Sequence, residues 1–142
     1  MNYSNDNGDS TLIDYYQGAY GPTIRIDIRS LETLVKFRDI FELLAKGKMS
    51  EVRLEDIKMV KLQGIRSLVL KRLPEDESDK KSLRLLSLHP EGAVFCWSMN
   101  ATRWLECGEL LDALVEENQP GHQYLTSEGI DDALVEVAFM EK

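Results

Sequence analysis

The chain has 142 residues, of which 43 % are hydrophobic and 30 % are charged. This length suffices for one domain with one core and is too short for two ordinary domains. No apolar run approaches the roughly 18–20 residues of a membrane-spanning helix, and residues 1–9 lack the positive start and apolar stretch of a secretion signal. We therefore expect a single-domain, soluble protein of the cytoplasm.

Charge is unevenly distributed along the chain. The sequence has 17 Lys or Arg and 25 Asp or Glu, which gives a net charge of −8. Residues 1–105 hold 16 basic and 15 acidic side chains, whereas residues 106–142 hold ten acidic side chains and one lysine. Such a field repels nucleic acid and anionic membranes and attracts basic proteins. We expect a protein partner, no nucleic acid and no membrane; acidity that serves solubility alone is the alternative.

The first part of the chain predicts an irregular segment, a strand and a helix. Residues 1–22 combine Asn, Asp, Ser and Gly with a group of tyrosines and predict irregular structure. Residues 23–29 alternate isoleucine with polar or charged side chains, which is the pattern of a half-buried strand. Ser30 is a suitable N-cap, and apolar side chains then recur at helical spacing. We expect a helix over residues 31–46, ended by Gly47.

The middle of the chain predicts short strands. Residues 51–73 favour two or three of them, with a helix over residues 55–62 as the alternative. Two apolar runs, residues 83–88 and 93–99, flank a turn that holds proline and glycine, and this arrangement predicts a hairpin. The second run is rich in Val, Phe and Trp, so we expect it in the interior of a sheet.

The last third predicts a second helix and a closing strand. Over residues 105–117, leucines form one face of the helix and carboxylates form the other. Residues 133–140 have apolar side chains on both faces, which indicates an interior strand. Hairpin-linked strands flanked by helices indicate an α+β fold. We expect residues 23–142 to form one domain, a mainly antiparallel sheet of five to six strands with two helices packed on one face.

The sequence shows no recognisable catalytic, cofactor or metal motif. A glycine-rich phosphate loop, a nucleophile elbow and a paired-histidine zinc motif are all missing from it. Cys96 and Cys107 are expected to be buried packing residues, and with His89 and His122 they show no zinc-type spacing. We therefore expect no catalytic residue, no cofactor and no metal. A small hydrolase that uses His122 with a nearby carboxylate is the alternative.

The region of the second helix supplies candidates for contact with a partner. Glu109, Asp112 and Glu116 lie on its expected exposed face, and Glu116 lies near the end where the helix dipole disfavours negative charge. Trp104 precedes the expected helix and, if half exposed, would anchor an interface; packing under the loop is the alternative. The pair Asp131-Asp132 is expected to close the turn before the last strand, because strand neighbours point to opposite faces and cannot share a site.

Two segments near the end of the chain resemble a known family. The run P-G-H-Q-Y-L-T over residues 120–126, followed by D-D-A-L-V-E-V over residues 131–137, resembles the end of small immunity proteins of bacterial polymorphic toxin systems. The resemblance implies a non-enzymatic cytoplasmic protein that binds and neutralises a cognate toxin. It adds His122 and Tyr124 to the candidate partner-binding residues, with a structural role as the alternative. The other candidate function is a self-associating module, a homodimer paired through residues 52–54.

Overall fold

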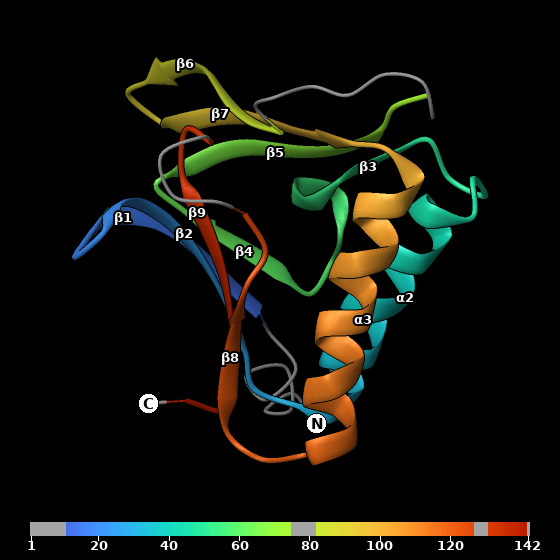
Figure 1. Ribbon diagram of the computed structural model, residues 1–142. Coiled ribbons are helices and arrows are strands. Elements are labelled where there is room, and N and C mark those ends of the chain that lie inside the picture. The colour runs from blue at the N-terminus through green and yellow to red at the C-terminus, as the bar shows by residue number, and fades with distance from the viewer. Residues whose placement is uncertain (1–10, 75–81, 127–130, 142) are drawn as a thin grey trace.

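The computed structural model describes residues 11–74, 82–126 and 131–141. Within these ranges the chain forms two α-helices, nine strands and one short 3-10 helix (Figure 1). In chain order they are β1 (Thr11–Gly18), β2 (Gly21–Ile28), α2 (Leu31–Ala45), β3 (Glu51–Arg53), η1 (Leu54–Asp56), β4 (Val60–Gln63), β5 (Ile65–Arg72), β6 (Leu83–His89), β7 (Gly92–Met99), α3 (Ala101–Glu117), β8 (Gly121–Tyr124) and β9 (Leu134–Phe139). Neither described helix has the length and apolar character needed to cross a membrane.

The strands form two mixed sheets. The five-stranded sheet has the order β4-β1-β2-β9-β8, and the four-stranded sheet has the order β3-β5-β7-β6. The pairs β1–β4, β2–β9 and β5–β7 are parallel, and the other neighbours are antiparallel. The predicted α+β class is confirmed, but the nine strands do not form the single sheet that was expected. Alternation of apolar and polar residues identifies a strand without identifying its neighbours, so it could not show that the chain passes back and forth between two sheets.

Helices α2 and α3 lie side by side along one side of the molecule (Figure 1). α2 begins as predicted, because the Thr33 amide donates to Ser30 Oγ at 3.2 Å. It ends at Ala45, and Gly47 has a φ of 75°, the left-handed conformation expected after a helix. Arg72 of β5 then donates from Nη1 to the carbonyl oxygens of Leu44 and Ala45, at 2.9 and 2.7 Å. A cation therefore stabilises the C-terminal end of α2.

Strand β1 corrects the prediction that residues 1–22 are irregular. Residues 11–18 form a hairpin with β2, in which Tyr15 lies opposite Ile24. The Tyr15 ring packs edge-on against Phe95 of the other sheet, with ring centroids 5.0 Å apart. Threonine, isoleucine and tyrosine favour extended backbone that packs on a sheet, and here this tendency outweighs the neighbouring turn residues. Residues 1–10 lie outside the described residues.

The hairpin of β6 and β7 and the interior position of two strands are confirmed. Pro90 and Glu91 form the hairpin turn, and β7 lies between β5 and β6. β9 lies between β2 and β8, and all six of its residues are buried. The alternative helix over residues 55–62 is reduced to the single turn of η1, after which β4 is extended.

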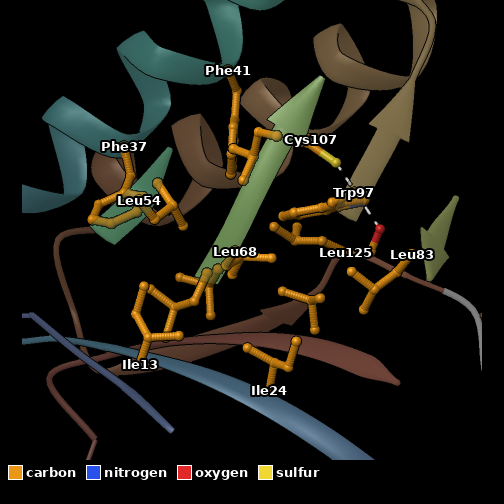
Figure 2. Close-up of a cluster of buried hydrophobic side chains, with 14 of the residues drawn as sticks. Ile13, Ile24, Phe37, Phe41, Leu54, Leu68, Leu83, Trp97, Cys107 and Leu125 are labelled. Atoms are coloured by element: carbon orange, nitrogen blue, oxygen red, sulfur yellow. Dashed lines mark hydrogen bonds between the residues drawn. The ribbon is translucent and has the colours of Figure 1, made fainter. Parts of the chain in front are cut away.

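One hydrophobic core fills the space between the two sheets and the helices (Figure 2). Ile13 and Ile24 of the five-stranded sheet approach it from one side, Leu68 of β5 lies in its middle, and Phe37 and Phe41 enter from α2. Burial of such side chains is the main favourable contribution to folding. Both predicted packing cysteines can be placed: Cys107 is buried in this core, whereas Cys96 on β7 is only half-buried.

Trp104 belongs to the core, which corrects its prediction as a half-exposed interface anchor. Its side chain is 0 % exposed, and its indole nitrogen donates to the Lys71 carbonyl at 3.0 Å. The ring lies 5.0 Å from that of Trp97 and 5.5 Å from that of Phe41. The reason is that Asn100 caps α3 and starts it four residues before the predicted Leu105. Trp104 is therefore in the first turn of α3, on the face that the helix buries.

The carboxylates of Asp131 and Asp132, which the sequence predicted to close the turn before the last strand, also connect the two sheets. Asp131 Oδ1 accepts hydrogen bonds from the Ser82 amide and hydroxyl and from the Leu83 amide, at 2.7, 2.9 and 2.9 Å. Asp132 Oδ2 accepts from the Leu85 amide at 2.7 Å. β6 is an edge strand, so these bonds satisfy amides that would otherwise be open to pairing with another chain.

Replacing Trp104 by alanine tests the assignment of this residue to the core. We expect Trp104→Ala to lower the free energy of unfolding by about 3–5 kcal/mol, because it opens a cavity and removes the hydrogen bond to Lys71. Urea denaturation followed by circular dichroism measures the change. Leu105→Ala is the matched control, since Leu105 is 46 % exposed, and should change stability by less than about 1 kcal/mol. Equal, small effects for both variants would contradict the assignment.

Candidate functional site

Apart from the buried Trp104, the predicted partner-binding residues lie on two surfaces, and the first is the outer side of α3. We call the line of residues Leu105, Glu109, Asp112 and Glu116 the α3 stripe. These positions are separated by four, three and four residues, so they follow one line along the helix. Leu105, Glu109 and Glu116 are exposed and Asp112 is half-buried. The three acidic residues predicted as contacts are therefore brought together, and an exposed leucine precedes them on the same line.

Asp112 has a structural role in addition to its place in the α3 stripe. Arg38 of α2 donates from Nη1 to Asp112 Oδ1 at 2.8 Å, and this ion pair joins the two helices. The hydrogen bond to Asp112 also raises the pKa of the Arg38 guanidinium. Glu109 and Glu116 form no ion pair with any residue in the described ranges. They are therefore the carboxylates of the stripe that are available to a partner.

The charges of α3 oppose the dipole of their own helix. Its last turn holds Glu116 and Glu117 and no basic residue, and its first turn holds Arg103 and no acidic residue. The partial negative charge at a helix C-terminus repels carboxylates and attracts cations. Carboxylates three or four residues apart, as in the α3 stripe, also repel each other. α2 shows the favourable arrangement, with Glu32 in its first turn and Arg72 at its end.

The second surface is the outer face of the five-stranded sheet, where His122 and Tyr124 lie on β8. Glu136 of β9 lies opposite Tyr124 in the β8–β9 pair and opposite Arg25 in the β2–β9 pair. Three tyrosines gather around this row: Tyr16, Tyr20 and Tyr124 are 37, 67 and 45 % exposed. We call the set of Tyr16, Tyr20, His122, Tyr124, Glu136 and Glu141 the tyrosine face.

His122 forms an ion pair on the tyrosine face. Its Nδ1 lies 2.8 Å from Glu141 Oε2, and its ring packs edge-on against Tyr124 with centroids 5.6 Å apart. The hydrogen bond to Glu141 raises the pKa of His122 above its usual value of 6.5. The charge of Glu136 raises the pKa of Tyr124, so this phenol stays protonated. When the His122 imidazole is charged, its Nδ1–H donates the hydrogen bond to Glu141 Oε2.

Glu136 is the least exposed acidic group of the tyrosine face. It is 8 % exposed, and within the described parts of the chain its side chain forms no hydrogen bond or ion pair. It borders a hollow of about 170 Å³ beneath Tyr16, Tyr20 and Tyr124. A second hollow of about 500 Å³ is lined by Tyr20, His122, Tyr124, Thr126 and Leu134. One ligand atom each from His122, Glu136 and Glu141 can be chosen so that all three lie within 4.8 Å of one another.

For the hydrolase alternative, His122 and Glu141 supply a histidine–carboxylate pair, and Thr126 and Cys107 are the candidate nucleophiles considered among the described residues. Thr126 lines the same hollow as His122, but its hydroxyl donates to the Ala133 carbonyl and accepts from the Val135 amide. Burial raises the pKa of Cys107 to about 12, so that thiol remains protonated. Neither side chain is prepared for nucleophilic attack.

Sequence reasoning missed Glu136, Glu141, Tyr16 and Tyr20 as neighbours of His122. A usable signal was present for Glu136, which is the only charged residue in the L-V-E-V-A-F run of β9. A carboxylate in an otherwise buried strand is costly and needs a reason. Tyr16 and Tyr20 reach the tyrosine face through the order of the strands, and Glu141 reaches it through the left-handed backbone at Met140. The sequence reveals neither.

Comparison with known proteins identifies no relative. The chain matches no protein-family model, no curated protein and no solved structure. The resemblance of residues 120–126 and 131–137 to immunity proteins therefore stays a prediction, and the functional argument depends on the chemistry of the two surfaces.

The ion pair of His122 predicts a pH-dependent change that Glu141→Gln should remove. We expect this substitution to lower the pKa of His122 toward 6.5, measured by NMR titration of the imidazole in metal-free buffer. Because the folded pKa is raised, the pair stabilises the fold below pH 6.5 and this contribution is lost as the pH rises through the folded pKa. For an exposed pair the difference in unfolding free energy is a few tenths of a kcal/mol.

Glu109→Gln is the control for this titration, because it removes an exposed carboxylate of α3 and should leave the pKa of His122 unchanged. An unchanged His122 pKa in Glu141→Gln would show that the ion pair does not form in solution.

Proposed function

We propose that the chain is a non-enzymatic binding protein of the cytoplasm that inhibits a basic toxin domain, in the manner of an immunity protein. The contact surface is the α3 stripe. The observation that carries the proposal is that Glu109, Glu116 and Glu117 have no ion-pair partner among the described residues, and that Glu116 and Glu117 also oppose the helix dipole. The resemblance of the C-terminal segments to immunity proteins supports the same function.

The acidic residues of α3 lower the stability of their own helix. Each carboxylate in the last turn of a helix costs about 0.3–1 kcal/mol, and repulsion along the stripe adds a few tenths of a kcal/mol per pair. A partner that neutralises these carboxylates would remove this cost in the complex, which gives the charge pattern a function. Lysine and arginine side chains of a basic protein would do so, and the same field would accelerate their approach.

Leu105 gives the α3 stripe an apolar contact at one end. It is 46 % exposed and lies four residues before Glu109, on the same line of the helix. Interfaces combine a desolvated apolar contact with charged groups at the rim. The stripe offers this combination on a rigid helix, because Trp104 anchors the first turn of α3 in the core.

Self-association through β3 is less well supported. β3 is an edge strand, as the alternative function requires, but it has only three residues. Its two exposed residues are charged, and Glu51 forms ion pairs with Arg53 and Lys71. Short, charged edge strands resist pairing with another chain. A partner other than a second copy of this chain is therefore favoured.

Charge reversal on the α3 stripe tests the binding surface. The variant Glu109→Lys/Glu116→Lys leaves intact the ion pair between Asp112 and Arg38 that joins the two helices. The matched control, Asp56→Lys/Glu91→Lys, makes the same change in net charge at exposed residues of η1 and the β6–β7 turn. Capture from a lysate of the source organism at about 50 mM salt, followed by mass spectrometry, should recover a basic protein with the wild type and the control. The stripe variant should lose it.

Two outcomes contradict this assignment. Equal recovery by the stripe variant and the control would show that the α3 stripe is not the contact surface. Undiminished recovery at about 500 mM salt would show that binding is not electrostatic.

Co-expression tests the inhibitory part of the proposal separately. The captured protein, produced alone in a bacterial host, should arrest growth, and the wild-type chain should restore growth where the stripe variant does not. A gene for a toxin domain beside the gene for this chain is also expected. If the captured protein is harmless when produced alone, this chain binds it without acting as an immunity protein, and the inhibitory part of the proposal is wrong.

A further inference from the structure

The tyrosine face brings together three side chains that are separated in the sequence. His122 comes from β8, Glu136 from the neighbouring β9, and Glu141 from the segment after β9. Imidazole nitrogen and carboxylate oxygen are ligands of zinc and of related divalent ions. The shortest separation, 2.8 Å between His122 Nδ1 and Glu141 Oε2, is close to the roughly 3.4 Å between two ligands that are each about 2.1 Å from a tetrahedral ion.

Glu136 supplies an independent indication of a cation. Its residue is only 8 % exposed, and it lies beside His122 and Glu141 on the outer face of the five-stranded sheet. Within the described ranges Glu136 has neither a hydrogen bond nor an ion pair, although Arg25 lies opposite it on β2. One of its oxygens lies within 4.8 Å of a ligand atom of His122 and of a carboxylate oxygen of Glu141, so the three side chains converge. A divalent ion there would satisfy it.

The backbone at Met140 places Glu141 in this group. Residues 136, 138 and 140 of a regular strand would point to one face, and residue 141 would point to the other. Met140 instead has a φ of 58°, a left-handed conformation that costs a non-glycine residue about 1–2 kcal/mol. Its amide still donates to the Ile28 carbonyl at 2.9 Å, so the turn follows directly on the end of β9. Strained backbone is concentrated at functional sites, and here it accompanies the return of Glu141 to the face of His122.

We propose that His122, Glu136 and Glu141 bind a divalent transition-metal ion, with Zn²⁺ as the expected occupant, on the outer face of the five-stranded sheet. The ligand set provides one nitrogen, two oxygens and two negative charges, which balance the ion. Three protein ligands leave a fourth position for a water molecule. Of the three ligands, His122 also lines the hollow that Tyr20, Tyr124 and Thr126 border. Binding requires the ligand atoms to move closer together from their present spread of up to 4.8 Å.

Metal titration of the full chain tests the site. Isothermal titration calorimetry with ZnCl₂ should show one Zn²⁺ per chain, and MgCl₂ should give no comparable heat, because magnesium prefers oxygen ligands. Replacement of one ligand, by His122→Asn or Glu141→Gln, should weaken zinc binding at least tenfold. His89→Asn is the matched control for the histidine, and the double variant Cys96→Ser/Cys107→Ser is the control for the thiols; both should bind zinc as the wild type does.

Glu136→Gln gives a second, opposite readout. In metal-free buffer it should raise the melting temperature, since it removes the repulsion between the Glu136 and Glu141 carboxylates, whose oxygens lie within 4.8 Å of each other. With excess ZnCl₂ the wild type should melt at a higher temperature than it does without zinc, and Glu136→Gln should show no such rise. The Co²⁺-loaded wild type should show a visible spectrum without the strong thiolate bands of a cysteine-bound ion.

The proposal is overturned by any of three results: zinc binding that is equally strong in His122→Asn and Glu141→Gln, binding that is lost in the cysteine or His89 controls, or no binding by the correctly folded wild type at millimolar zinc. The test does not depend on a protein partner, so its outcome is separate from that of the function proposed for the α3 stripe.

Discussion

Three aromatic rings meet where α2, α3 and the four-stranded sheet converge, and the arrangement of both surfaces depends on them. Trp97 of β7 lies 5.0 Å from Trp104 and 5.9 Å from Phe41, measured between ring centroids. Aromatic side chains bury large areas, and their geometry fixes the orientation of the elements that carry them. Because Trp104 points into the core, the opposite side of α3 must point to solvent, and that side holds Glu109 and Glu116. β8 follows α3 directly, so the same anchor limits where His122 can lie.

The features that could be predicted from the sequence are those that local contacts determine. Ser30 and Gly47 correctly marked the ends of α2, and the proline–glycine turn correctly marked the β6–β7 hairpin. Asn100 was an equally local signal. As the N-cap it starts α3 at Ala101, which places Trp104 in the first turn, on the buried face. The division into two sheets could not be predicted, because the parallel pairing of β5 with β7 and of β2 with β9 depends on contacts between distant segments.

The candidate sites show the same limit. The carboxylates of the α3 stripe were predictable because helical spacing alone brings Glu109, Asp112 and Glu116 to one line. The partner of Asp112 was not, since Arg38 lies 74 residues away on another helix. His122 could be selected, but its neighbours Glu136 and Glu141 follow from the antiparallel pairing of β8 with β9 and from the left-handed backbone at Met140.

The central claim is that the acidic side of α3 serves binding and weakens the helix that carries it. The free energy of unfolding of Glu116→Gln/Glu117→Gln, measured by urea denaturation at low salt, tests this claim most directly. Both positions are in the last turn of α3, where no basic residue offsets them. The double variant should be more stable than the wild type by about 0.6–2 kcal/mol. A loss of stability of similar size would show that these carboxylates support the fold, and would contradict the account.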